Sequence, residues 1–138
     1  MSTTDRINVT AQLHTTNVFS GHITDELSGD ELLTHTNIGR ITYQRYRLTR
    51  TLTGGYIEMP LDGQQIELPV DEYRLYDLLQ TGLQSTNGIP YTFLWLIPED
   101  REPFFTEAGK YYVVFRFFPR EESAADTVLK LSFEVTVI

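Results

Sequence analysis

The chain has 138 residues, a length that suits a single domain with one hydrophobic core. It contains no cysteine, so disulfides, thiolate metal sites and cysteine nucleophiles are excluded. The formal net charge of −8, from 19 acidic and 11 basic residues, repels a phosphate backbone, and we therefore expect no nucleic-acid partner.

The first third of the chain predicts two short strands and a loop. Met1–Thr10 contains no apolar signal-peptide core, and no apolar run in the chain approaches the ~20 residues of a membrane span. Residues 6–13 alternate apolar and polar side chains, as a half-buried strand does, and residues 18–24 predict a second, weaker strand. The acidic segment 25–33 is interpreted as a solvated loop, because it lacks the alternating oxygen ligands of a calcium site.

The three histidines do not indicate a metal site. His14, His22 and His35 each lie alone in turns rich in threonine and asparagine, whereas zinc needs ligands at helical or hairpin spacing. His14 and His22 would approach each other across a predicted hairpin. We nevertheless interpret all three as ordinary surface residues and expect no metal and no cofactor.

A long strand is predicted over residues 40–51, which are rich in β-branched and aromatic side chains. Ile41 and Tyr43 share one face, whereas Tyr46 and Leu48 share the other, and this change of phase predicts a β-bulge between Tyr43 and Tyr46. The arginines in this region are interpreted as a solvated face. They are Arg40, Arg45, Arg47 and Arg50.

Asp62-Gly63 lies between two alternating segments, 56–61 and 64–70, and is a preferred dipeptide for a type I′ hairpin turn. Pro60 and Pro69 cannot donate a backbone hydrogen bond, so we expect both strands at a sheet edge or paired on one side only. The apolar residues of the two strands would face the same side of this hairpin. They are Ile57, Met59, Leu61, Ile66, Leu68 and Val70.

The rest of the chain predicts one short helix, a loop and three strands. The helix covers residues 71–80, with Asp71 as its N-cap and Gly82 beyond its end, and we expect it to cross between two sheets. Residues 81–90 predict a loop and residues 91–97 a strand. Two further strands, 111–118 and 129–137, predict an antiparallel hairpin. About eight strands and one helix favour an all-β antiparallel sandwich, with residues 1–138 as a single domain.

The sequence contains no motif of a known catalytic mechanism. It has no G-x-S-x-G, no P-loop and no G-x-G-x-x-G, and we expect no enzyme. A hydrolase or metal site built from the acidic loops is kept only as a formal third hypothesis, since the separation of carboxylates in space decides it.

Apolar side chains on the outward faces of two strands favour a protein interface. If Tyr111, Val113 and Phe115 face the core, every second residue from Tyr112 onward faces outward. On the strand at 91–97, Leu94 and Leu96 face outward if Trp95 faces inward. Monomers rarely expose such a patch, although the helix at 71–80 or the loop at 98–106 could instead cover it. The candidate interface residues are Leu94, Leu96, Tyr112, Val114 and Phe118.

The order acidic-x-Gly-x-Tyr at Glu107, Gly109 and Tyr111 resembles the entry to strand F of an immunoglobulin-like sandwich. In that fold the tyrosine hydroxyl bonds to the backbone a few residues upstream, and Val113 lies where antibody domains keep a cysteine. Residues 91–137 as a whole resemble the end of an immunoglobulin-like domain of tailed-bacteriophage virion proteins, a group that includes the N-terminal domain of upper-baseplate proteins.

The resemblance implies an immunoglobulin-like fold and a non-enzymatic virion structural protein without a cofactor. A capsid decoration (cement) protein is favoured, because baseplate members continue into long helices or coiled coils that this sequence lacks; a tail or baseplate component is the next choice. We expect other virion proteins and further copies of the chain as partners, no membrane partner, and location in the virion. The alternative is a carbohydrate-binding sandwich module that uses exposed aromatic residues, here Tyr43, Tyr46 or Tyr56.

Overall fold

The computed structural model describes residues 7–13, 17–68, 78–86, 88–97, 104–119 and 128–138. These residues form an all-β, sandwich-like fold with nine strands in two sheets. The strands are β1 (Ile7–Ala11), β2 (Asn17–Gly21), β3 (Ile38–Arg50), β4 (Tyr56–Pro60), β5 (Ile66–Glu67), β6 (Leu79–Thr86), β7 (Ile89–Ile97), β8 (Gly109–Pro119) and β9 (Leu129–Val137).

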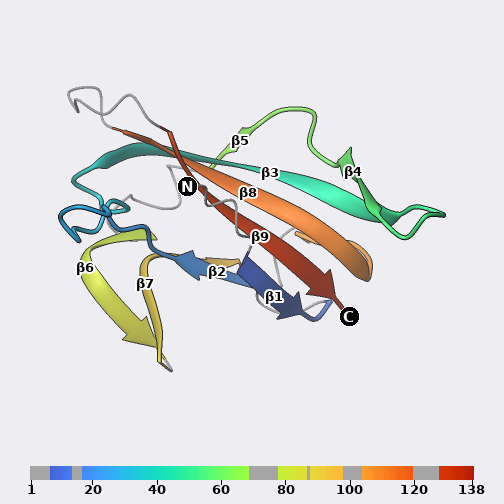
Figure 1. The fold of residues 1–138 in the computed structure, drawn as a ribbon, viewed down its shortest axis with the longest axis horizontal. Coiled ribbons are helices and arrows are strands. Elements are labelled where there is room, and N and C mark those ends of the chain that lie inside the picture. The colour runs from blue at the N-terminus through green and yellow to red at the C-terminus, as the bar shows by residue number, and fades with distance from the viewer. Residues whose placement is uncertain (1–6, 14–16, 69–77, 87, 98–103, 120–127) are drawn as a thin grey trace.

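The larger sheet has the order β1-β9-β8-β3-β4, with β5 also paired to β3, and the smaller sheet has the order β2-β7-β6. Strand pairs are antiparallel except for β1 and β9, which run parallel. Figure 1 shows the long strands β3, β8 and β9 side by side on one side of the molecule and the smaller sheet on the other. Side chains from both sheets meet in one core.

Aromatic rings fill the centre of the core. Phe115 on β8 is fully buried, and its ring centroid lies 5.2 Å from that of Phe19 and 5.3 Å from that of Phe93. The rings of Trp95 and Phe133 also pack against it at 5.9 and 5.6 Å. Tilted and edge-to-face pairs of this kind add about 0.5–1.5 kcal/mol each beyond the burial of their area. The core therefore needs no inter-sheet disulfide.

The predicted tyrosine contact at the entry to β8 is confirmed. The Tyr111 hydroxyl donates a hydrogen bond of 2.7 Å to the backbone oxygen of Glu107, and Arg47 Nη1 donates to the same hydroxyl at 3.2 Å. Gly109, which lies between Glu107 and Tyr111, has a φ of 147°, in a region that residues with a Cβ rarely adopt. The turn thus fixes the start of β8 against β3.

The predicted β-bulge between Tyr43 and Tyr46 is wrong. The pairing of β3 with β8 is continuous from Arg40 to Leu48, and the register shift lies between Ile38 and Arg40. The change of phase arises because arginines occupy inward positions after Tyr43. Arg45 lies 4.9 Å from the centroid of the Phe104 ring, and Arg47 lies 5.0 Å from that of Tyr111. Their guanidinium groups lie over these rings and also find polar partners.

The predicted hairpin around Asp62-Gly63 is also wrong. β4 and β5 do not pair with each other; both pair with β3, end to end along the same strand. Gly63 is not among the described glycines with positive φ, which a type I′ turn would require. Asp62 is instead buried, with 8% of its surface exposed. Its carboxylate binds Arg45 rather than shaping a turn.

The sequence predicts a helix over residues 71–80 and a loop over residues 81–90. Most of the predicted helix at 71–80 lies outside the described residues, but the expected crossover occurs, since β5 and β6 belong to different sheets. Leu79 and Gln80 begin β6, so the predicted loop at 81–90 is largely strand. β6 pairs with β7 with a register shift between Leu79 and Gln84, and this tertiary pairing outweighs its weak local pattern.

Candidate interaction surfaces and cavity

The five predicted interface residues do not form one surface. Leu94 and Leu96 lie on β7 in the smaller sheet, whereas Tyr112, Val114 and Phe118 lie on β8 in the larger sheet. The inward faces of both sheets form the core, so the two groups point to opposite sides of the sandwich. The inward position of Trp95, on which the assignment of Leu94 and Leu96 rested, is confirmed by its 5% exposure.

The predicted interface residues on the outer face of the larger sheet are not an open apolar surface. Val114 is 2% exposed and lies between Gln44 and Ser132 in the strand register. Tyr112 stacks on Tyr46 with ring centroids 5.5 Å apart. Phe118 lies under the guanidinium of Arg40, 4.4 Å from the ring centroid. Tyr112 and Phe118 thus pack against side chains of the neighbouring strand and Val114 is almost completely buried, which leaves little open apolar surface here.

The outer face of the smaller sheet exposes a narrow apolar pair. Val18 and Leu96 are direct partners in the register of β2 and β7, and they are 45% and 50% exposed. Leu94 lies on the same face and is partly buried. This pair is smaller than the exposed apolar group on β4. That group was not identified as a surface from the sequence.

That group lies on β4, whose five residues are all exposed. Ile57 and Met59 are 52% and 53% exposed, and Leu61, just beyond the strand end, is 48% exposed. Because they alternate along the chain, all three lie on one side of the strand; we call them the β4 stripe. Figure 1 shows β4 at the end of the larger sheet that lies away from β6 and β7. The smaller sheet does not cover the β4 stripe.

The backbone N–H groups of β4 point alternately toward β3 and away from it. Leu61 N donates to Arg45 O at 2.9 Å, and hydrogen-bonded pairs alternate along an antiparallel ladder. Ile57 and Met59 therefore bond to β3, while the N–H groups of Tyr56 and Glu58 point away from it. Pro60 has no N–H to offer at the next outward position. Within the described part of the chain, β4 is an edge strand, and the N–H of Tyr56 points to its outer side.

A buried ion pair anchors the segment that follows the β4 stripe. The Asp62 carboxylate accepts hydrogen bonds from Arg45 N at 2.8 Å, Nε at 3.0 Å and Nη2 at 2.8 Å. Arg45 Nη1 donates to Phe104 O at 2.6 Å. Burial alone would raise the pKa of Asp62, but the hydrogen bonds and positive charge of Arg45 outweigh it and hold this pKa below its usual value. The pair ties the end of β4 to β3 and to the segment before β8.

The three tyrosines proposed for glycan binding occupy different environments. The ring of Tyr43 is partly buried and packs against the core, 5.3 Å from Trp95 and 5.4 Å from Phe104, so it presents little open aromatic surface. Tyr46 lies on the outer face of the larger sheet, stacked on Tyr112. Tyr56 is 46% exposed, with Lys110 Nζ 5.4 Å from its ring centroid.

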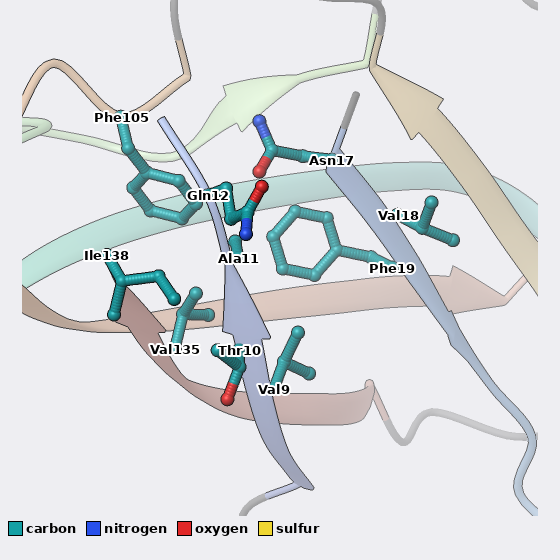
Figure 2. Close-up of a pocket in the computed structure, with 10 residues that line it drawn as sticks. All are labelled: Val9, Thr10, Ala11, Gln12, Asn17, Val18, Phe19, Phe105, Val135 and Ile138. Carbon is teal, nitrogen blue, oxygen red and sulfur yellow. The ribbon is translucent and has the colours of Figure 1, made fainter. Parts of the chain in front are cut away.

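A cavity of about 440 Å³ lies between β1 and β2 (Figure 2). Figure 2 shows the carboxamides of Gln12 and Asn17 pointing toward each other, with Phe19 and Phe105 beside them. The Oδ1 atom of Asn17 is buried and has no hydrogen-bond partner. The cavity is lined by Val9, Thr10, Ala11, Gln12, Asn17, Val18, Phe19, Phe105, Val135 and Ile138.

The histidines do not form a site in the described residues. β1 pairs with β9, and β2 pairs with β7, so the predicted hairpin that would bring His14 and His22 together is wrong. His14 itself lies outside the described residues. His22 Nδ1 lies 3.1 Å from Glu31 Oε1. No group of three histidine, aspartate or glutamate residues in the described ranges could hold a metal ion.

Comparisons with known proteins leave the family of the chain open. No family model matches the chain. No curated protein matches it in sequence. None of the helices in the described ranges is both long enough and apolar enough to cross a membrane.

Proposed function

We propose that this chain is a non-enzymatic structural subunit that joins a larger virion assembly through β4. The observation that carries the proposal is the β4 stripe, three half-exposed apolar side chains on the edge strand of the larger sheet. Proteins usually blunt such edges, because an exposed apolar edge strand pairs with other chains. Contact with a neighbouring subunit removes this apolar surface from water.

We infer further that the sandwich is immunoglobulin-like. Support comes from the strand order β9-β8-β3-β4 opposite β2-β7-β6, which corresponds to G-F-C-C′ opposite B-E-D in variable-type domains. The bond from Tyr111 to Glu107 occupies the place of the tyrosine corner, and Val113 follows two residues later in place of the cysteine.

The resemblance of residues 91–137 to tailed-phage virion domains is the reason for proposing a virion. A capsid decoration protein is the first choice and a tail or baseplate component the second. The proposed mode of contact is strand addition, in which main-chain bonds give affinity and alternate side chains give specificity. Tyr56 supplies an outward N–H group, and the β4 stripe supplies the apolar side chains.

Light scattering coupled to size-exclusion chromatography tests this proposal. The wild-type chain is expected to associate as its concentration rises, and the double variant Ile57→Asn/Met59→Asn to remain monomeric. The matched control is Val18→Asn/Leu96→Asn, which removes two equally exposed apolar side chains from the smaller sheet and is expected to associate like the wild type. A wild-type chain that stays monomeric at every concentration, or a control that dissociates while the β4 variant does not, would contradict the contact.

A second candidate function is glycan binding, favoured by the stack of Tyr46 on Tyr112 close to Lys110 and Tyr56. Aromatic faces with polar groups beside them suit ligands that have one apolar face and several hydroxyls. Glycan-array binding that Tyr46→Ala and Tyr56→Ala abolish would support it. An array without any signal would remove it.

A further inference from the structure

The cavity between β1 and β2 has the properties of a small-molecule site. Its volume of about 440 Å³ lies within the ~300–1,000 Å³ range of ligand pockets. Most of its lining is apolar, and none of its lining residues carries a charged side chain. A ligand that fits this lining has an apolar body and no net charge.

Asn17 is an anomaly in this lining. It has the same strand parity as Phe19, so its side chain lies on the inward face of β2, where an apolar residue would be expected. Its Oδ1 atom is nevertheless buried without a hydrogen-bond partner. Buried acceptors in proteins are almost always paired, because an unpaired one destabilises the fold. An acceptor left unpaired at the wall of a cavity points to a donor supplied from outside the chain.

We propose that this cavity binds a small neutral molecule with an apolar body and one N–H or O–H group that donates to Asn17 Oδ1. The apolar body lies against Val9, Phe19 and Val135, which line the cavity with Asn17. The site is on the side of the sandwich formed by β1 and β2, and it is independent of the contact proposed for β4.

The test compares two probes of nearly equal shape, indole, which donates through its N–H, and indene, which has no donor. Titration followed by two-dimensional NMR is expected to show shifts at Val9, Val135 and Ile138, with indole binding about 5- to 30-fold more tightly than indene, which is the effect of one hydrogen bond of about 1–2 kcal/mol. Quinoline, which accepts but cannot donate, is expected to bind no more tightly than indene.

Two variants separate the roles of shape and hydrogen bond. Asn17→Leu removes the unpaired acceptor, so it is expected to raise the melting temperature and to abolish the advantage of indole over indene. Ala11→Leu fills the cavity and is expected to weaken both probes, whereas Leu96→Ala on the outer face is expected to change neither. Equal affinity for indole and indene in the wild type, no binding of either probe, or shifts outside the cavity would overturn the proposal.

Discussion

Replacing Asp62 by asparagine tests whether Asp62 forms a buried ion pair, as in the structure, or a type I′ turn, as the sequence pattern predicts. If Asp62-Gly63 formed a type I′ turn, Asn-Gly would serve equally well, and stability would change by less than ~0.5 kcal/mol. In the structure the Asp62 side chain is 6% exposed and accepts three hydrogen bonds from Arg45. Asparagine keeps the shape of this side chain but removes its charge and one acceptor.

The expected loss is about 2–3 kcal/mol. Breaking a buried ion pair costs roughly 3–5 kcal/mol, and bonds to charged groups contribute about 1.5–3 kcal/mol each. The Arg45 side chain is 21% exposed, so water replaces part of what it loses, and we expect the loss to fall below the range for a fully buried pair. For a domain of 138 residues this corresponds to a fall in Tm of roughly 6–12 °C, at ~3–4 °C per kcal/mol.

Urea unfolding monitored by Trp95 fluorescence measures this loss directly. The matched control is Asp30→Asn, which removes an exposed carboxylate and is expected to stay within ~0.5 kcal/mol of the wild type. An Asp62→Asn variant as stable as the control would refute the ion pair as the anchor of this segment.

Three further predictions follow from the same contacts. Arg45 holds the pKa of Asp62 below its usual value of about 3.9, so the ion pair contributes fully above that pH and is lost as the pH falls through the folded-state pKa. The difference in stability between the wild type and Asp62→Asn is therefore expected to be constant from pH 5 to 7 and to narrow below about pH 4. A difference that stays constant down to pH 2 would contradict this. Tyr111→Phe removes the donor to Glu107 O and is expected to cost about 1–2 kcal/mol in urea unfolding, more than Tyr112→Phe, whose hydroxyl contacts Ser132 on a half-buried face; equal losses would argue against the corner. Gly109→Ala would place a Cβ 2.7 Å from Arg47 Nη2 at a φ of 147° and is expected to cost about 1–3 kcal/mol, whereas a Cβ on Gly63 meets no atom within 4 Å, and Gly63→Ala should leave Tm nearly unchanged.

Strand positions followed from the sequence wherever side chains alternated in polarity. Residues 129–137 were predicted as a strand, and the structure places β9 over the same residues, with buried and partly exposed positions alternating from Leu131 to Val137. β6 was missed because its Gln, Thr and Gly residues have no apolar period, and only pairing with β7 makes it a strand. Local patterns report burial on one face, and they do not report partners distant in the sequence.

The errors at the candidate site have the same origin. An outward apolar residue on β8 looked like an interface because the sequence does not show that Val114 is buried. Tyr43 looked like a surface aromatic although it packs against the core. Arg45 and Arg47 looked solvated although their guanidinium groups lie over aromatic rings. The proline in β4 did indicate an edge strand. In the described residues β4 is the last strand of its sheet and pairs with β3 on one side.

Hydrogen–deuterium exchange at β4 tests the proposed assembly contact most directly. The amides of Ile57 and Met59 already bond to β3, so they are expected to exchange slowly at every protein concentration. The amide of Tyr56 points outward and is expected to exchange quickly in dilute protein and to become protected when the protein is concentrated enough to associate. Association that protects the amides of β2 or β7 instead, and leaves the amide of Tyr56 exchanging as fast as in dilute protein, would contradict assembly through β4.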